Sequence, residues 1–219
     1  MRFILILAAL ALVAGCAGGS QQPGSTAPKP ATTVVDLAAV TPEHVATLPH
    51  KEADDLVGDM MVHYIGLAFK RCPDQSHPMP VRQACMATQA EAAFDSAGEL
   101  TPLCKVHAND PEDYAFCLII GAENAAMVKV AGGNLASDLD WSDVDHIPNK
   151  ARRVFAEFVV KKCGEDRVCF VKHAAALLGL SPQVIKSCRE HSPLVNQVFC
   201  ITDAYSAGVM QQAIKTASS

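Results

Sequence analysis

The chain has 219 residues, nine cysteines and a formal net charge of −5 at neutral pH. This mildly acidic balance argues against nucleic acid and against an anionic lipid surface as the main partner. Half of the residues are hydrophobic and only 5% are aromatic, and after the N-terminal leader no apolar stretch approaches the length of a membrane span. The chain is long enough to build its own hydrophobic core.

A short positive start and an apolar run, Phe3 to Ala14, open the chain, and the run is too short for a permanent membrane helix. It ends in Leu12-Val13-Ala14-Gly15-Cys16. This motif resembles the lipobox of bacterial lipoproteins, in which small residues precede an obligatory cysteine. The resemblance covers only residues 1–16. It implies a signal peptide over residues 1–15, cleavage before Cys16, and acylation of Cys16, with each buried methylene adding about 0.8 kcal/mol to the anchor.

Glycine, serine, proline and glutamine dominate the segment that follows, residues 16–33, which we therefore expect to be a flexible tether. In lipoproteins of Gram-negative bacteria, an aspartate after the lipidated cysteine resembles an inner-membrane retention signal. Ala17 stands at this position. The resemblance therefore implies a lipid-anchored protein of the cell envelope, at the outer membrane and facing the periplasm.

Hydrophobic periodicity and proline-marked helix starts predict an all-α domain after the tether. From Lys51 to Cys72, apolar side chains recur at helical spacing, namely Leu56, Met60, Tyr64, Leu67 and Phe69. A capping residue followed by a proline is typical of a helix start, and four such pairs occur, at Thr101-Pro102, Asp110-Pro111, Ser181-Pro182 and Ser192-Pro193. The alternation typical of strands is not evident in the sequence.

The cysteines after Cys16 form two sets of four, which indicate an internal duplication. The sets are Cys72, Cys85, Cys104, Cys117 and Cys163, Cys169, Cys188, Cys200. In both sets the second and third cysteines are nineteen positions apart. We expect two tandem disulfide-stapled units of about four short helices each, at residues 34–131 and 148–219, which could pack as one pseudo-symmetric bundle. An acidic linker, residues 132–147, separates them.

Disulfide bonds fit the location that the leader implies, because removing Cys16 leaves an even number of cysteines. Each bond would contribute about 2–4 kcal/mol to stability. Shared midpoints favour nested pairs, Cys85–Cys104 inside Cys72–Cys117 and Cys169–Cys188 inside Cys163–Cys200. Adjacent pairs, Cys72–Cys85 and Cys163–Cys169, would instead close the neighbouring loops, and the spacing leaves both arrangements open.

Two histidines are the candidate metal ligands, because His107 and His191 each follow a cysteine at Cys-x-x-His spacing. A thiolate ligand must be free, and disulfide formation removes it. We therefore expect no metal and no cofactor, and we interpret the two histidines as residues near helix C-termini. We expect His63 to lie at the edge of the bundle.

The linker carries four aspartates, at positions 138, 140, 143 and 145, which partly match a calcium-binding loop. The pattern has neither the required glycine nor the bidentate glutamate. We interpret it as an exposed linker with capping aspartates. Trp141 is expected to pack the linker onto the bundle, the alternative being an exposed contact anchor.

Small residues occupy matching places in the two halves, at Gly121, Ala122, Ala125 and at Ala204, Ala207, Gly208. They predict close helix packing within the bundle, or else docking of a partner helix. The sequence contains no nucleophile elbow, zinc-hydrolase motif, redox dithiol motif or phosphate-binding glycine loop. We therefore expect a protein that is not an enzyme.

Two classes of function fit these features best. The first is a non-catalytic interaction or assembly module for an outer-membrane or secretion complex, attached through the lipid anchor and bound to an envelope protein partner. The alternative is a periplasmic carrier of a small ligand or metal, using a cleft between the halves; a hydrolase without a recognisable motif ranks third. A deep apolar pocket would favour the carrier, and an exposed apolar patch would favour docking.

Overall fold

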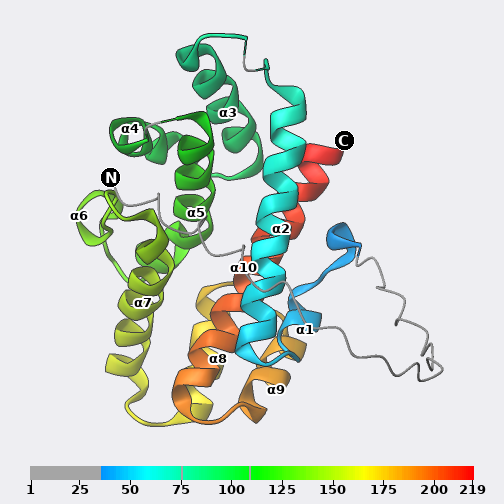
Figure 1. Cartoon of the computed structure of the whole chain (residues 1–219). Coiled ribbons are helices and arrows are strands. Elements are labelled where there is room, and N and C mark those ends of the chain that lie inside the picture. Colours follow the sequence, from blue (N-terminus) through cyan, green and yellow to red (C-terminus); the bar gives the residue numbers. More distant parts are fainter. Residues whose placement is uncertain (1–35, 75, 109) are drawn as a thin grey trace, which may run out of the picture. The chain divides into compact units, whose positions relative to one another are not determined.

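Helices form every regular element in the part of the chain that the structure, a computed structural model, describes: residues 36–74, 76–108 and 110–219 (Figure 1). The all-α prediction is confirmed. The predicted signal peptide, Cys16 and the tether lie outside the described residues. No helix within the described ranges is long and apolar enough to span a membrane.

Four helices accompany each cysteine set. Those of the first half are α2 (His50–Arg71), α3 (Met79–Ala93), α4 (Ala97–His107) and α5 (Pro111–Val130). Those of the second half are α7 (Ile147–Cys163), α8 (Arg167–Leu177), α9 (Pro182–Glu190) and α10 (Leu194–Ser218). The helices are not uniformly short, because α2 has 22 residues and α10 has 25.

Shorter elements lie before α2 and between α5 and α7. They are η1 (Leu37–Ala39), α1 (Pro42–Val45), α6 (Leu135–Asp138) and η2 (Val144–His146). The last two belong to the predicted linker, which is therefore partly helical.

Two of the four proline-marked pairs, Asp110-Pro111 and Ser181-Pro182, are capped helix starts as predicted. At Ser192-Pro193 the helix begins one residue later, at Leu194, without a side-chain cap. The side chain of Asp110 accepts a hydrogen bond from the backbone N–H of Asp113, and that of Ser181 from Val184. The prediction at Thr101-Pro102 is wrong, because Pro102 lies inside α4. Proline has no backbone N–H, so α4 lacks the i to i−4 hydrogen bond that residue 102 would otherwise make. The hydroxyl of Thr101 donates separately to the carbonyl of Ala97.

The first long helix of each half packs against the last helix of the other half. Helix α2 runs beside α10 in the most extensive helix contact of the domain, and α5 packs on α7 as well as on α3 and α4 (Figure 1). Residues 35–219 form one compact unit. The pseudo-symmetry of the two halves stays a prediction.

The eight cysteines of the two sets all form disulfide bonds, but the predicted nested pairing is wrong. The bonds are Cys72–Cys85, Cys104–Cys117, Cys163–Cys169 and Cys188–Cys200. Each joins two consecutive helices across the turn between them, with Cα atoms 5.5–5.7 Å apart. The turns bring neighbouring cysteines together first, so the adjacent arrangement holds. Two of the bonds lie in the first half and two in the second, and none of the four joins the halves.

The linker packs through Trp141, as expected. Its side chain is 5% exposed, and its Nε1–H donates to the carbonyl of Leu135 at 2.8 Å. A Cβ atom on Gly121 would lie 3.0 Å from two carbons of this indole ring. Gly121 therefore makes room for Trp141 rather than for a partner helix.

Candidate functional site

A cavity of about 620 Å³ lies between the last helices of the two halves. Each half contributes the same pair of elements to its wall: α5 and the turn between α3 and α4 from the first half, and α10 and the turn between α8 and α9 from the second. Ligand sites typically enclose about 300–1,000 Å³. The α5–α10 cavity, as we call it, thus has the volume of a small-molecule site.

Small side chains leave this space open. Ala122, Ala125 and Ala126 line the cavity from α5, and Gly208 lines it from α10. A Cβ atom on Gly208 would lie 3.1 Å from the ring of Pro42, which also lines the cavity. The predicted small-residue positions therefore serve both packing and the cavity, and no partner helix is needed to explain them.

A few polar groups converge on the apolar wall. Tyr205 on α10 is half-buried, and burial raises its pKa to about 12, with Glu123 and Asp95 adding to the shift. Its hydroxyl therefore stays protonated at neutral pH and can donate a hydrogen bond. Lys129 also lines the cavity, with its Nζ 2.6 Å from Glu99 Oε1. A largely apolar wall that also holds Asp95, Lys129 and Tyr205 suits an amphipathic small molecule.

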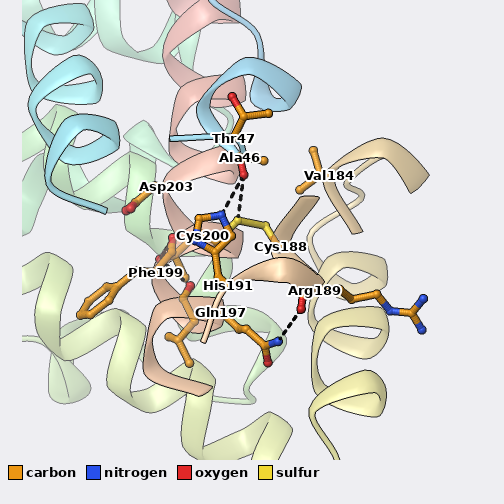
Figure 2. The surroundings of a disulfide bond; sticks show 12 residues. Ala46, Thr47, Val184, Cys188, Arg189, His191, Gln197, Phe199, Cys200 and Asp203 are labelled. Carbon is orange, nitrogen blue, oxygen red and sulfur yellow. Dashed lines mark hydrogen bonds between the residues drawn. A yellow bond between two sulfur atoms is a disulfide. The ribbon is translucent and has the colours of Figure 1, made fainter. Parts of the chain in front are cut away.

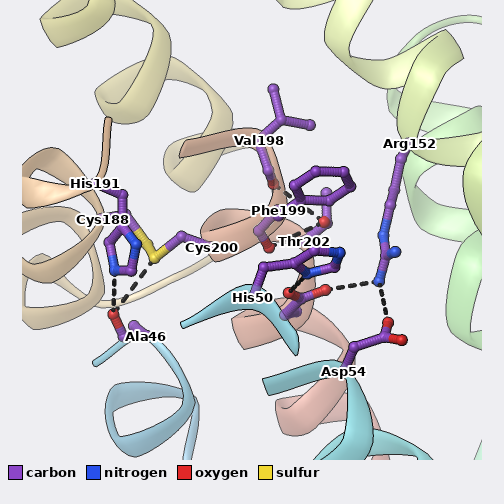
Figure 3. Close-up of polar contacts among 11 residues, drawn as sticks. Ala46, His50, Asp54, Arg152, Cys188, His191, Val198, Phe199, Cys200 and Thr202 are labelled. Carbon is purple, nitrogen blue, oxygen red and sulfur yellow. Dashed lines mark hydrogen bonds and ion pairs between the residues drawn. A yellow bond between two sulfur atoms is a disulfide. The ribbon is translucent and has the colours of Figure 1, made fainter. Parts of the chain in front are cut away.

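A second, polar site lies where α2, α7 and α10 meet (Figure 3). Asp203 on α10 has a fully buried side chain; its Oδ2 lies 2.8 Å from His50 Nδ1, and its Oδ1 accepts a hydrogen bond from Arg152 Nη2 at 2.6 Å. Arg152 Nη2 also approaches Asp54 Oδ1 at 3.4 Å. We call these four residues the α2–α10 polar cluster.

Phe199 holds the cluster from one side. Its ring stacks on His50 with centroids 3.7 Å apart and planes 4° from parallel. The guanidinium carbon of Arg152 lies 5.7 Å from the same ring, within range of a cation–π contact. Burial raises the pKa of Asp203, against the opposing effects of Arg152 and His50.

Glu123 on α5 adds a further buried carboxyl group nearby. Its side chain is 4% exposed, and burial raises its pKa to about 7, with Ser206 and Arg152 opposing the shift. Its Oε2 has no hydrogen-bond partner among the described residues. A buried carboxyl group without a strong partner takes up a proton more readily than one in water.

The two predicted metal candidates do not gather further ligands. His107 is exposed, and the sulfur of Cys104 is bonded to Cys117. His191 is half-buried with its Nε2 3.2 Å from the carbonyl of Ala46, beside the Cys188–Cys200 disulfide (Figure 2). In both halves the cysteine of the Cys-x-x-His pattern is therefore in a disulfide bond and has no thiolate to offer a metal.

The linker aspartates and His63 also lie apart from any ligand cluster. Asp140 accepts hydrogen bonds from Ser142, and Asp143 pairs with His146 at 2.8 Å. His63 is exposed on α2. Within the described ranges, the one group of three residues with ligand atoms in mutual reach is His50, Asp54 and Asp203, all within 4.8 Å.

The sequence could have indicated only one part of this cluster. His50 and Asp54 are four positions apart and so share a face of one helix. Asp203 is 153 residues from His50 and 51 from Arg152, which no local pattern can bring together.

Comparisons of the chain with protein-family models, with curated proteins and with solved structures find no match.

Proposed function

We propose that this chain is a non-catalytic binding protein of the cell envelope that carries a small amphipathic molecule in the α5–α10 cavity. The volume and wall of the cavity carry the proposal: about 620 Å³, alanine and glycine on the facing helices, and polar residues that include Tyr205 and Lys129. This combination is the usual form of a small-ligand site.

The location is part of the same proposal. Four disulfide bonds favour an oxidising compartment, and the lipobox-like leader supports lipidation of Cys16 and attachment to the outer membrane on its periplasmic side. The predicted tether, residues 16–33, would leave the domain free to exchange ligand with its surroundings.

A ligand is favoured over a docked partner by where the apolar surface lies. The exposed large apolar side chains of the described residues come one from each of seven helices, at Val62, Val81, Val106, Phe116, Val160, Val168 and Val195. No helix presents a row of them, as a docking face for a partner helix requires. Binding of an envelope protein in a secretion or outer-membrane assembly stays a prediction from the sequence.

Filling the cavity tests the proposal. The probe is the apolar fluorophore 1-anilinonaphthalene-8-sulfonate, whose emission rises in an apolar site. Ala126 lines the cavity and is not fully buried, so Ala126→Leu should reduce the bound signal severalfold. Ala84→Leu, an exposed position on α3 outside the cavity wall, is the matched control and should bind as the parent does. Equal binding by all three proteins would place the probe elsewhere and refute the proposal.

A further inference from the structure

We propose that His50, Asp54 and Asp203 form a binding site for a divalent transition-metal ion of the Zn²⁺ class. The site is separate from the α5–α10 cavity, and it differs from the two histidines that the sequence singled out. It places one imidazole and two carboxylates where α2 and α10 lie side by side.

The backbone fixes the spacing of the three ligands. His50 and Asp54 occupy successive turns of one face of α2, and Asp203 faces them from α10. Ligand atoms that bind zinc at about 2.0–2.2 Å lie about 3–4 Å from one another. The distance between His50 Nδ1 and Asp203 Oδ2 is 2.8 Å, and the ligand atoms of all three residues lie within 4.8 Å of one another, which is close to this geometry.

The residues around the ligands hold them as a metal site requires. Arg152 binds Asp203 through Oδ1, which leaves Oδ2 directed at His50. The stacked ring of Phe199 fixes the plane of the imidazole. A metal ion would take the place of the proton shared by Nδ1 and Oδ2 and leave the Arg152–Asp203 pair in place. Partners that orient ligands in this way are characteristic of metal sites.

An ion can reach the site from solvent, and the Asp54 side chain can rotate to bind it. The side chain of Asp203 is fully buried, whereas those of His50 and Asp54 are 33% and 57% exposed. Asp54 is held only by a long 3.4 Å contact with Arg152, so rotation of its side chain can close the site around an ion. Water can then fill the remaining coordination positions.

Charge and donor type favour the ion over a purely structural ion pair. Asp54 and Asp203 both pair with the single guanidinium of Arg152, so two carboxylates share one cation. The nearby carboxyl group of Glu123 is more than nine-tenths buried, and one of its oxygens has no hydrogen-bond partner. A divalent cation offsets this excess of carboxylates. An imidazole ligand selects zinc and its neighbours over magnesium and calcium, which prefer oxygen alone.

The test is isothermal titration calorimetry of Zn²⁺ into the full chain carrying Cys16→Ser, with the disulfides intact, so that no free thiol competes. His50→Gln and Asp54→Asn remove one ligand each, and we expect each to weaken binding by about tenfold or more. The controls are His63→Gln and Asp59→Asn, exposed residues on the same helix, which should bind Zn²⁺ as the parent does. Mg²⁺ titrated into the parent should bind at least tenfold more weakly.

Circular dichroism and the melting temperature without metal check that the variants fold. His50 and Asp54 are exposed enough for the glutamine and asparagine replacements to be tolerated. X-ray absorption at the zinc edge should then show one imidazole among oxygen ligands. The proposal is overturned if the parent binds no Zn²⁺, or if the ligand variants fold and bind it as tightly as the control variants.

Discussion

The α5–α10 cavity and the α2–α10 polar cluster share α10 and both lie near α5, but they use these two helices in opposite ways. On α10, Tyr205 lines the cavity, while Asp203, two residues earlier, lies in the cluster. On α5, Ala122 lines the cavity, and the next residue, Glu123, is buried near the cluster. One face of each helix leaves space, and the neighbouring face is filled by charged groups.

This difference shows how α5 and α10 can line an open cavity while the bundle stays stable. Open space in a core forfeits dispersion contacts, so stability must come from elsewhere in the bundle. The polar cluster joins α2, α7 and α10, and each disulfide joins two consecutive helices. The cavity region should therefore tolerate change, whereas the buried Arg152–Asp203 pair of the cluster should not.

Removing Arg152 should have the largest effect on stability. Arg152→Met leaves the carboxylate of Asp203, whose side chain is fully buried, without its cation. Breaking a buried pair in this way typically costs about 3–5 kcal/mol. Urea unfolding followed by circular dichroism measures the change. Arg153→Met, which removes an exposed arginine paired with Glu157 on the same helix, is the control and should unfold near the parent midpoint. Equal midpoints for the two variants would show that the cluster does not stabilise the fold.

Glu123→Gln should change how stability depends on pH. The pKa of Glu123 is about 7 in the folded protein against an ordinary value of 4.5. The folded state thus binds a proton that the unfolded chain has released, and the free energy of unfolding falls as pH rises through this interval. The shift corresponds to about 3 kcal/mol.

The glutamine variant lacks this loss. Its free energy of unfolding should match that of the parent at acidic pH and exceed it increasingly up to and above pH 7, in urea titrations repeated across pH. The exposed Glu157 serves as control through Glu157→Gln, which should show no such gain. Parallel pH profiles for Glu123→Gln and the parent would mean that Glu123 is already ionised in the folded state at neutral pH.

The sequence predicted the helices because their signals are local. Asp110-Pro111 and Ser181-Pro182 place a cap and a proline at adjacent positions, and the structure begins helices there. Disulfide pairing depends on the angles of the turns between helices, which cysteine spacing does not encode, and the nested arrangement was therefore wrong. The cluster around Asp203 needs three helices from both halves, so only the His50–Asp54 spacing was visible beforehand.

Replacing an alanine by leucine should cost more stability in the packed core than in the wall of the cavity. Ala207 on α10 is fully buried and lies outside the cavity wall, so Ala207→Leu should overpack the core at a cost of about 1–3 kcal/mol. Ala126→Leu places the same side chain into the cavity, and we expect a smaller loss. Comparison of urea midpoints measures both. A larger loss at Ala126 than at Ala207 would show that the cavity is not open to side chains.

The smallest effect concerns the edge of the cavity where Pro42 meets α10. Gly58 on α2 has no heavy atom within 4 Å of an added Cβ, so Gly58→Ala should stabilise the helix by up to about 1 kcal/mol. At Gly208 the same methyl group would lie 3.1 Å from Pro42 Cγ, and this close contact should offset much of the gain. Thermal unfolding of both variants measures the difference. If Gly208→Ala stabilises the protein as much as Gly58→Ala does, then α1 moves away from α10 readily, and the contact between Pro42 and Gly208 does not fix this edge of the cavity.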